Sequence, residues 1–120
     1  MIDPNCIFCK ISQNEIPSKK YFEDDNFLAF FDIDPIVENH LVFISKNHYE
    51  NISEMPDLEW KEFMLKAREI AEKLIKEINA DGYNLLLNQG EAAQSLVKHR
   101  PHCHIIPRYI NDKIKIDPRN

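Results

Sequence analysis

The residues best suited to chemistry gather near the end of the chain, between His99 and Arg108. In an extended strand, side chains two positions apart share a face, so we expect His102 and His104 to point the same way and Cys103 the opposite way. Two neighbouring imidazoles can divide phosphoryl chemistry, because one attacks phosphorus as a neutral nucleophile while the other donates hydrogen bonds to the phosphoryl oxygens. A His-x-His pair on its own also fits a metal pair or two incidental surface histidines.

A second group of reactive residues lies near the start of the chain. Cys6 and Cys9 have the spacing of a chelating thiolate pair, and a structural zinc ion needs two further nitrogen or sulfur ligands. No second close pair completes a zinc finger, so those ligands must come from distant positions. The odd total of three cysteines argues against a disulfide framework. A redox or metal-storage protein that also uses Cys103 is the alternative, although no thioredoxin-like pattern surrounds the motif.

Composition limits the kinds of partner. The chain has 120 residues, a net charge of -5 and 43% hydrophobic residues, which indicates one ordinary globular domain with a small core. An acidic chain is a poor match to a nucleic-acid backbone, but a local pocket can still hold a single nucleotide. No apolar run reaches the roughly 18 residues that span a bilayer, and the start lacks a signal-peptide pattern. We therefore expect a cytoplasmic protein with one domain over residues 1–120, irregular from about residue 110.

Hydrophobic periodicity predicts the elements that must position these residues. Apolar residues recur at steps of three and four across residues 58–80, opposite a charged face, which predicts one long helix with Asp57 as its N-cap. Short apolar runs bounded by Asp, Asn and Pro predict strands at residues 26–31, 40–44, 83–88 and 102–106. A short helix is predicted near residues 10–17. Strands on both sides of one long helix favour an α+β fold with an antiparallel sheet.

Five ordered motifs together resemble the histidine triad (HIT) family, and in particular its zinc-bearing bacterial-type branch. They are NCIFCKI at residues 5–11, FDIDP at 31–35, LVFISKNH at 41–48, NQGEAAQS at 88–95 and HCHIIPR at 102–108. The resemblance covers the chain from Asn5 to about Tyr109. It implies the HIT-like fold, an antiparallel sheet of about five strands with one long and one short helix. It also implies a homodimer paired through the long helix and a sheet edge.

The resemblance further implies a nucleotide hydrolase or transferase that cleaves the α-phosphoryl bond of purine nucleoside 5′-phosphoryl compounds, such as phosphoramidates or dinucleoside polyphosphates. His102 matches the nucleophile that forms a nucleotidyl-histidine intermediate, and His104 matches the histidine that contacts the phosphate. The matched substrate positions are Asp32 for the ribose hydroxyls, Ile33 for the base, Asn88 for phosphate and ribose, and Gln94 and Ser95 in the phosphate loop. Asp32 alone also fits a turn residue before Pro35. A nucleotide-binding or scaffold protein with little turnover is the alternative from another class.

The zinc-bearing branch supplies two distant ligands for the cysteine pair. The resemblance assigns them to His48, which follows a strand, and to His99, the first histidine of the closing run. The implied cofactor is a structural zinc ion held by Cys6, Cys9, His48 and His99. Four protein ligands close the coordination sphere, so such an ion cannot activate water. His40, at the start of a predicted strand, is interpreted as structural.

The chain departs from the family pattern at the site itself. The usual run is H-x-H-x-H, whereas here an extra residue separates His99 from His102. We expect a β-bulge at Pro101 to absorb it, because proline lacks an N–H and is tolerated at bulges and sheet edges. Arg100 is interpreted as a solvated surface residue. The loop also lacks the usual second glycine, and Gln94-Ser95 comes one position early, so the motifs do not specify the leaving group.

Overall fold

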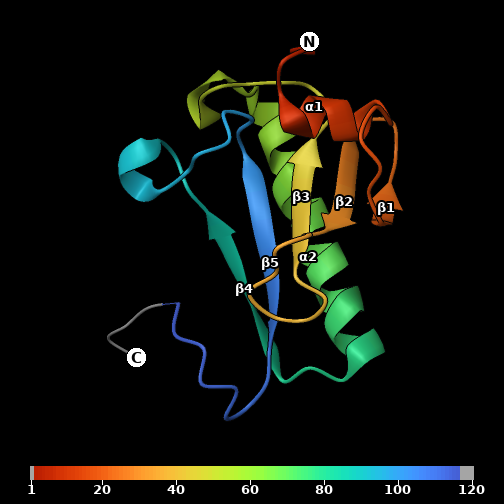
Figure 1. The fold of residues 1–120 in the computed structure, drawn as a ribbon, viewed down its shortest axis with the longest axis vertical. Coiled ribbons are helices and arrows are strands. Elements are labelled where there is room, and N and C mark those ends of the chain that lie inside the picture. Colours follow the sequence, from red (N-terminus) through yellow and green to blue (C-terminus); the bar gives the residue numbers. More distant parts are fainter. Residues whose placement is uncertain (1, 117–120) are drawn as a thin grey trace.

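A five-stranded sheet forms the frame that positions the histidines. The computed structural model describes residues 2–116, and its strands lie in the order β1-β2-β3-β5-β4 with every neighbouring pair antiparallel (Figure 1). The strands are β1 (Lys20–Glu23), β2 (Phe27–Phe31), β3 (Leu41–Ser45), β4 (Gly82–Leu87) and β5 (His102–Arg108). The helices are α1 (Ile7–Ser12) and α2 (Asp57–Ile78), with 3-10 turns at Ile52–Glu54 and Glu91–Ala93. The predicted α+β fold with an antiparallel sheet is confirmed.

Alternation along the strands divides the buried side chains between two faces of the sheet. One face joins the apolar side of α2, and the rings of Phe43 and Phe63 stack there with centroids 4.6 Å apart. The other face carries Val42 and Ile44, which share a buried cluster with Ile11 of α1. Because Ile44 pairs with His102 and Val42 with His104, both histidines belong to the α1 face. Cys103 lies on the opposite face, within the α2 cluster.

The long helix begins and ends at slightly different residues from those predicted. Pro56 occupies the N-cap, and Asp57 is the first helical residue, so the prediction of Asp57 as N-cap is wrong. Its carboxylate lies instead in the first turn, where the positive end of the helix dipole favours an acidic side chain. At the other end Asn79 adopts a left-handed backbone with φ 55 and its N–H bonds to Ile75 O, which ends the helix before residue 80.

The N-terminal third differs more from expectation. The short helix begins at Ile7 and not near residue 10, because the Cys6 side chain caps it by accepting from the Cys9 N–H. β1 was not among the predicted strands; it is a short edge strand whose register shifts between Lys20 and Phe22, so its side chains show no regular alternation. No helix within residues 2–116 is long and apolar enough to cross a membrane.

Residues 109–116 form turns and irregular chain, and residues 117–120 of the predicted irregular tail lie outside the described part.

Candidate active site and metal centre

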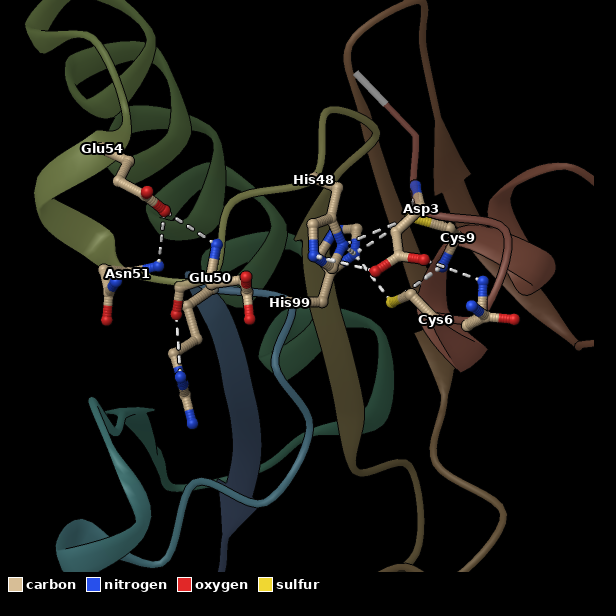
Figure 2. Close-up of polar contacts among 10 residues, drawn as sticks. Asp3, Cys6, Cys9, His48, Glu50, Asn51, Glu54 and His99 are labelled. Carbon is tan, nitrogen blue, oxygen red and sulfur yellow. Dashed lines mark hydrogen bonds and ion pairs between the residues drawn. The ribbon is translucent and has the colours of Figure 1, made fainter.

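Four side chains from separate parts of the chain converge near the end of β3. Cys6 and Cys9 belong to the start of α1, His48 follows β3 and His99 precedes β5 (Figure 2). His99 Nδ1 lies 3.3 Å from Cys6 Sγ and 3.5 Å from Cys9 Sγ. His48 Nδ1 lies 3.2 Å from His99 Nδ1 and 3.5 Å from Cys9 Sγ. A tetrahedral zinc ion with ordinary bond lengths requires S···N separations of about 3.6 Å and N···N separations of about 3.3 Å, so these donor atoms already have suitable spacing.

The ring of His99 is held in the form that a metal ligand needs. Its Nε2 lies 2.7 Å from Ser45 O, and because a carbonyl only accepts, Nε2 carries the proton and Nδ1 keeps its lone pair. Burial lowers the pKa of His99 to about 4, so the ring is neutral at pH 7. Metal-bound histidines ordinarily give their second N–H to a carbonyl or carboxylate in this way.

The sulfur atoms also receive suitable partners. The Cys9 N–H points to Cys6 Sγ at 3.4 Å, and the Asp3 N–H points to Cys9 Sγ at 3.4 Å. Burial raises the pKa of the Cys9 thiol to about 11, so its thiolate requires a bound cation and forms with release of a proton. Two thiols and two imidazoles with this spacing fit a metal ion that takes sulfur and nitrogen ligands.

His102 lies at the start of β5 with its ring buried beside this cluster. Its Nδ1 is 2.8 Å from the backbone oxygen of His99, so Nδ1 carries the proton and Nε2 keeps a lone pair. Burial lowers the pKa of His102, which keeps the ring neutral at pH 7. The ring of His104 lies on the same face with its centroid 5.4 Å away. His102 therefore has the protonation state of a nucleophile.

In His104 the proton is on the other ring nitrogen, Nε2, and its hydrogen bond with His40 sets this position. The backbone N–H of Ile36 donates to His40 Nδ1 at 3.1 Å, so the neutral ring of His40 carries its proton on Nε2. That atom lies 2.9 Å from His104 Nδ1, which must accept. Burial lowers the pKa of both rings, so each holds a single proton at pH 7. The remaining proton of His104 is therefore on Nε2, where it is available to donate.

Asp32 completes a second group of possible metal ligands with these two histidines. Its Oδ2 lies 3.7 Å from His40 Nε2, and the three side chains lie close enough to share an ion. However, His40 Nδ1 already accepts a backbone N–H, so a metal at Nε2 requires the ring to lose its only proton. We therefore interpret His40 and His104 as a hydrogen-bonded relay, with the Asp32 carboxylate nearby but beyond hydrogen-bond distance of His40 Nε2. Sequence reasoning interpreted His40 as structural, and only the pairing of β3 with β5 reveals its place beside His104.

A pocket of about 470 Å³ opens beside the two histidines of β5. Its walls come from α1, the end of β2 and the loop at residues 94–97. Three of the predicted substrate residues line it, namely Asp32, Ile33 and Gln94, and Ile33 is 95% exposed. Asn88 and Ser95, although predicted to contact substrate, are not among the lining residues within the described chain.

The extra residue between His99 and His102 is accommodated differently from our expectation. β5 begins at His102, so the extra residue lies in irregular chain before the strand and the predicted bulge at Pro101 is wrong. His99 is held by Ser45 O and the cysteine cluster, so the chain must turn between His99 and the strand.

Arg100 is 4% exposed, so its interpretation as a surface residue is also wrong. Its guanidinium donates to Ser95 Oγ at 2.9 Å, Ser95 O at 2.6 Å and Glu50 O at 2.8 Å, which replaces the hydration lost on burial. Ser95 is thereby engaged with Arg100.

Cys103 is separate from the other two cysteines. It is 0% exposed on the α2 face of the sheet, and burial raises the pKa of its thiol to about 12. A thiol in that state is a poor nucleophile, so a redox role that uses Cys103 loses support.

Comparison with known proteins agrees with this geometry. The model of the HIT domain family matches residues 13–111. An uncharacterized HIT-like protein of Methanocaldococcus jannaschii is 45% identical over 107 residues, which cover 89% of this chain and 81% of that protein. An adenosine 5′-monophosphoramidase of Saccharomyces cerevisiae is 42% identical over 107 residues, covering 89% and 65% respectively. An adenylylsulfatase of Arabidopsis thaliana is 37% identical over 108 residues, covering 90% and 54%.

A solved relative also has this fold. The crystal structure of a Zn-bound histidine triad family protein from Mycobacterium smegmatis has a TM-score of 0.80 and 31% identity, and the match covers 95% of this chain and 84% of that one. The sheet order, the histidine run at the start of β5 and these matches together assign the family: the chain belongs to the HIT family.

Proposed function

We propose that this chain is a nucleotide hydrolase or transferase that cleaves the α-phosphoryl bond of purine nucleoside 5′-phosphoryl compounds through a nucleotidyl intermediate on His102. The observation that carries the proposal is the opposite proton arrangement of two neighbouring rings. His102 keeps a lone pair on Nε2 because its Nδ1–H is given to His99 O. His104 carries its proton on Nε2 because His40 donates to its Nδ1. One ring can attack phosphorus while the other donates to a phosphoryl oxygen.

The reaction follows from these proton positions in two displacements. In the first, His102 Nε2 forms a bond to the α-phosphorus, and the bond to the leaving group breaks with its electron pair going to that group. An amine leaving group also takes up a proton from solvent as it departs, so that it leaves as a neutral amine. The His102 ring becomes positively charged, and the His99 carbonyl stabilises the charge at Nδ1–H. His104 Nε2–H donates to the phosphoryl oxygen as negative charge grows there. In the second, water attacks phosphorus, loses a proton to solvent and displaces neutral His102; a phosphate acceptor in place of water gives transfer.

The lining of the pocket supports a nucleoside as the group that is held. Phe30 and Ile33 offer apolar surface to a base, and the Asp32 carboxylate, whose side chain is 22% exposed, can accept hydrogen bonds from ribose hydroxyls. A volume of about 470 Å³ is within the usual range for a small-molecule site. Among leaving groups we propose an amine first, because the yeast relative is named an adenosine 5′-monophosphoramidase, and a nucleoside polyphosphate second.

We also propose that the four converging side chains hold a structural zinc ion. The donor spacing, the Nδ1 lone pair of His99 and the Zn-bound Mycobacterium relative support this ion. With Cys6, Cys9, His48 and His99 as ligands, the tetrahedral sphere is full and leaves no position for water or substrate. Its chemical contribution is therefore to hold α1 and the segment before β5 against the end of β3.

A second copy of the chain is the proposed protein partner. β4 lies at an edge of the sheet, and Leu65 of α2 and Leu85 of β4 are 54% and 36% exposed beside it. Both line a hollow together with Trp60 and Tyr83. An unpaired strand edge next to an apolar surface suits a self-complementary dimer, because pairing covers both at once.

Release of AMP tests the enzyme proposal. The purified protein is incubated with adenosine 5′-phosphoramidate or a diadenosine polyphosphate, beside His102→Ala and the control Cys103→Ala, whose side chain lies on the opposite face of the same strand. We expect wild type and Cys103→Ala to release AMP and His102→Ala to release none. Equal rates for wild type and His102→Ala would contradict the proposal.

A scaffold or nucleotide-binding protein with little turnover remains the second candidate. The observation in its favour is that both Ser95 oxygens accept hydrogen bonds from Arg100, which leaves this loop fewer contacts for a leaving group. Calorimetry distinguishes the two: AMP that binds to a protein without hydrolytic activity on either substrate favours the scaffold.

A further inference from the structure

The short helix α1 belongs to the metal cluster and to the substrate pocket at the same time. It has six residues, whereas an isolated helix needs about 12–15 to be even marginally stable in water. Cys6 caps it and Cys9 lies within it, and both sulfur atoms face the histidines of the cluster. Ile7 and Ile11 of the same helix line the pocket. The position of this pocket wall therefore depends on the contacts of the two cysteines.

Phe8 connects the two sites directly. It lies between Cys6 and Cys9 in the sequence and lines the pocket. Its ring makes edge-to-face contacts with His102 at 5.2 Å and with His99 at 5.9 Å between centroids. A third contact, to Phe30 at 5.7 Å, holds the ring against β2. Phe8 therefore limits the rotation of the His102 ring from the side of the metal cluster.

His99 makes a second connection through its backbone. Its side chain is fixed by Ser45 O on one nitrogen and by the sulfur atoms on the other. Its carbonyl oxygen receives the Nδ1–H of His102 at 2.8 Å. Any shift of the His99 ring that follows loss of an ion from the cluster also displaces this acceptor. On this side the nucleophile is thus held by the ring of Phe8, which lies between the two cysteines in the sequence, and by a hydrogen bond to the cluster residue His99. Its other ring contact is with His104.

We propose that Phe8 is a positioning residue which, with the His99 carbonyl, couples occupancy of the Cys6/Cys9/His48/His99 cluster to the orientation of His102. Loss of the ion releases α1, weakens nucleotide binding and misaligns the nucleophile, while the core between the sheet and α2 stays folded because it lies on the other face. The inference rests on the proposed role of His102 as nucleophile. It adds a function to the metal centre beyond stabilising the N-terminus.

The test compares the zinc-loaded full chain, the same chain after chelation under reducing conditions, zinc-loaded Phe8→Leu and zinc-loaded Lys10→Ala. Lys10 lies on the same helix but has no contact with His99 or His102 among the interactions of the described residues, so it serves as the matched control. Zinc content, AMP affinity by calorimetry, kcat and KM for AMP release, and ¹⁵N–¹H NMR of the imidazoles are measured for each. His102→Ala assigns the His102 signals.

We expect Phe8→Leu to retain its zinc and its KM within about threefold but to lose between about tenfold and a hundredfold in kcat, as misplaced catalytic groups do. The His102 Nδ1–H signal should broaden or shift in that variant. Zinc-free wild type should show the same spectral change and bind AMP at least about tenfold more weakly, whereas Lys10→Ala matches wild type.

Unchanged His102 signals and AMP affinity after zinc removal would overturn the coupling, as would a Phe8→Leu variant with wild-type kcat. If Phe8→Leu does not fold, the comparison of zinc-loaded with zinc-free wild type decides alone. Failure of the proposed function would be distinguishable from failure of the coupling. If the proposed function is wrong, zinc-loaded wild type releases no AMP, and the imidazole spectra still report whether zinc orients His102.

Discussion

Replacing His40 removes the donor that sets the proton position on His104. His40 is 3% exposed, with its Nε2 2.9 Å from His104 Nδ1 and its Nδ1 accepting the Ile36 N–H at 3.1 Å. His40→Leu fills much of the same space without polar atoms. His40→Gln keeps an N–H donor at the end of a side chain of similar reach. The two variants therefore separate the effect of the hydrogen bond from the effect of lost volume.

The expected loss of rate follows from the change in that hydrogen bond during the reaction. A hydrogen bond between neutral groups contributes about 1 kcal/mol, and one that involves a charged group contributes about 1.5–3 kcal/mol. As His104 donates to a phosphoryl oxygen that gains charge, the His40–His104 bond strengthens from the first value toward the second. A difference of about 0.5–2 kcal/mol then enters the barrier, which predicts a fall in kcat of about 2- to 30-fold for His40→Leu.

Single-turnover release of AMP is the appropriate assay, because it reports the chemical step and not product release. AMP affinity and urea unfolding are measured in parallel to establish that each variant folds and binds. We expect His40→Gln to lie between His40→Leu and wild type. If both variants react within about twofold of wild type, or if His40→Leu weakens only nucleotide binding, the relay from His40 to His104 does not contribute to catalysis.

Four further predictions concern pH, metal, the loop and assembly. Burial lowers the pKa of His40 and His104, so below about pH 6.5 the unfolded chain binds protons that the native rings exclude. The free energy of unfolding therefore decreases as the pH is lowered below this value. Urea titrations at several pH values check this, and His104→Asn should weaken the dependence of the free energy of unfolding on pH. The same pH dependence in wild type and His104→Asn would contradict the prediction. Chelation under reducing conditions should lower the melting temperature of wild type and leave that of Cys9→Ser unchanged, and equal shifts would argue against a metal at this cluster. Arg100→Met should lower the free energy of unfolding by about 2 kcal/mol, measured by urea unfolding, because the two oxygens of buried Ser95 and the backbone oxygen of Glu50 lose their donor; no change would show that these bonds contribute nothing net. Leu85→Glu should shift the sedimentation coefficient from dimer to monomer, and a monomeric wild type would refute the proposed pairing.

The parts of the site that sequence predicts well depend on local geometry. The shared face of His102 and His104, with Cys103 opposite, follows from the two-residue repeat of any strand and needs no knowledge of its neighbours. The long helix follows from its period of three and four, and only its ends differ by one or two residues. The cysteine pair fixes two donors by spacing, whereas His48 and His99 were assigned through the family resemblance, and the fold brings all four together.

The features that sequence reasoning missed depend on pairing between distant segments. His40 joins the site because β3 runs antiparallel to β5, which brings residues 64 positions apart into contact. Arg100 looks like a surface residue in sequence, but oxygens of Glu50 and Ser95 surround its guanidinium. Neither arrangement leaves a periodic pattern, since each is set by long-range backbone positions. Strand β1, which the sequence did not predict, has a register shift and so lacks the alternation of side chains that would reveal it.

Detection of a covalent intermediate tests the central claim most directly. Wild type, His102→Ala and His104→Ala are mixed with adenosine 5′-phosphoramidate, quenched under alkaline conditions within the first turnover and analysed by intact mass and peptide mapping. We expect wild type to gain the mass of one nucleotidyl group on the peptide that contains His102. His104→Ala should form the same adduct more slowly, and His102→Ala should form none. AMP release by wild type without any adduct, or an adduct on another residue, would contradict the proposal that His102 is the nucleophile.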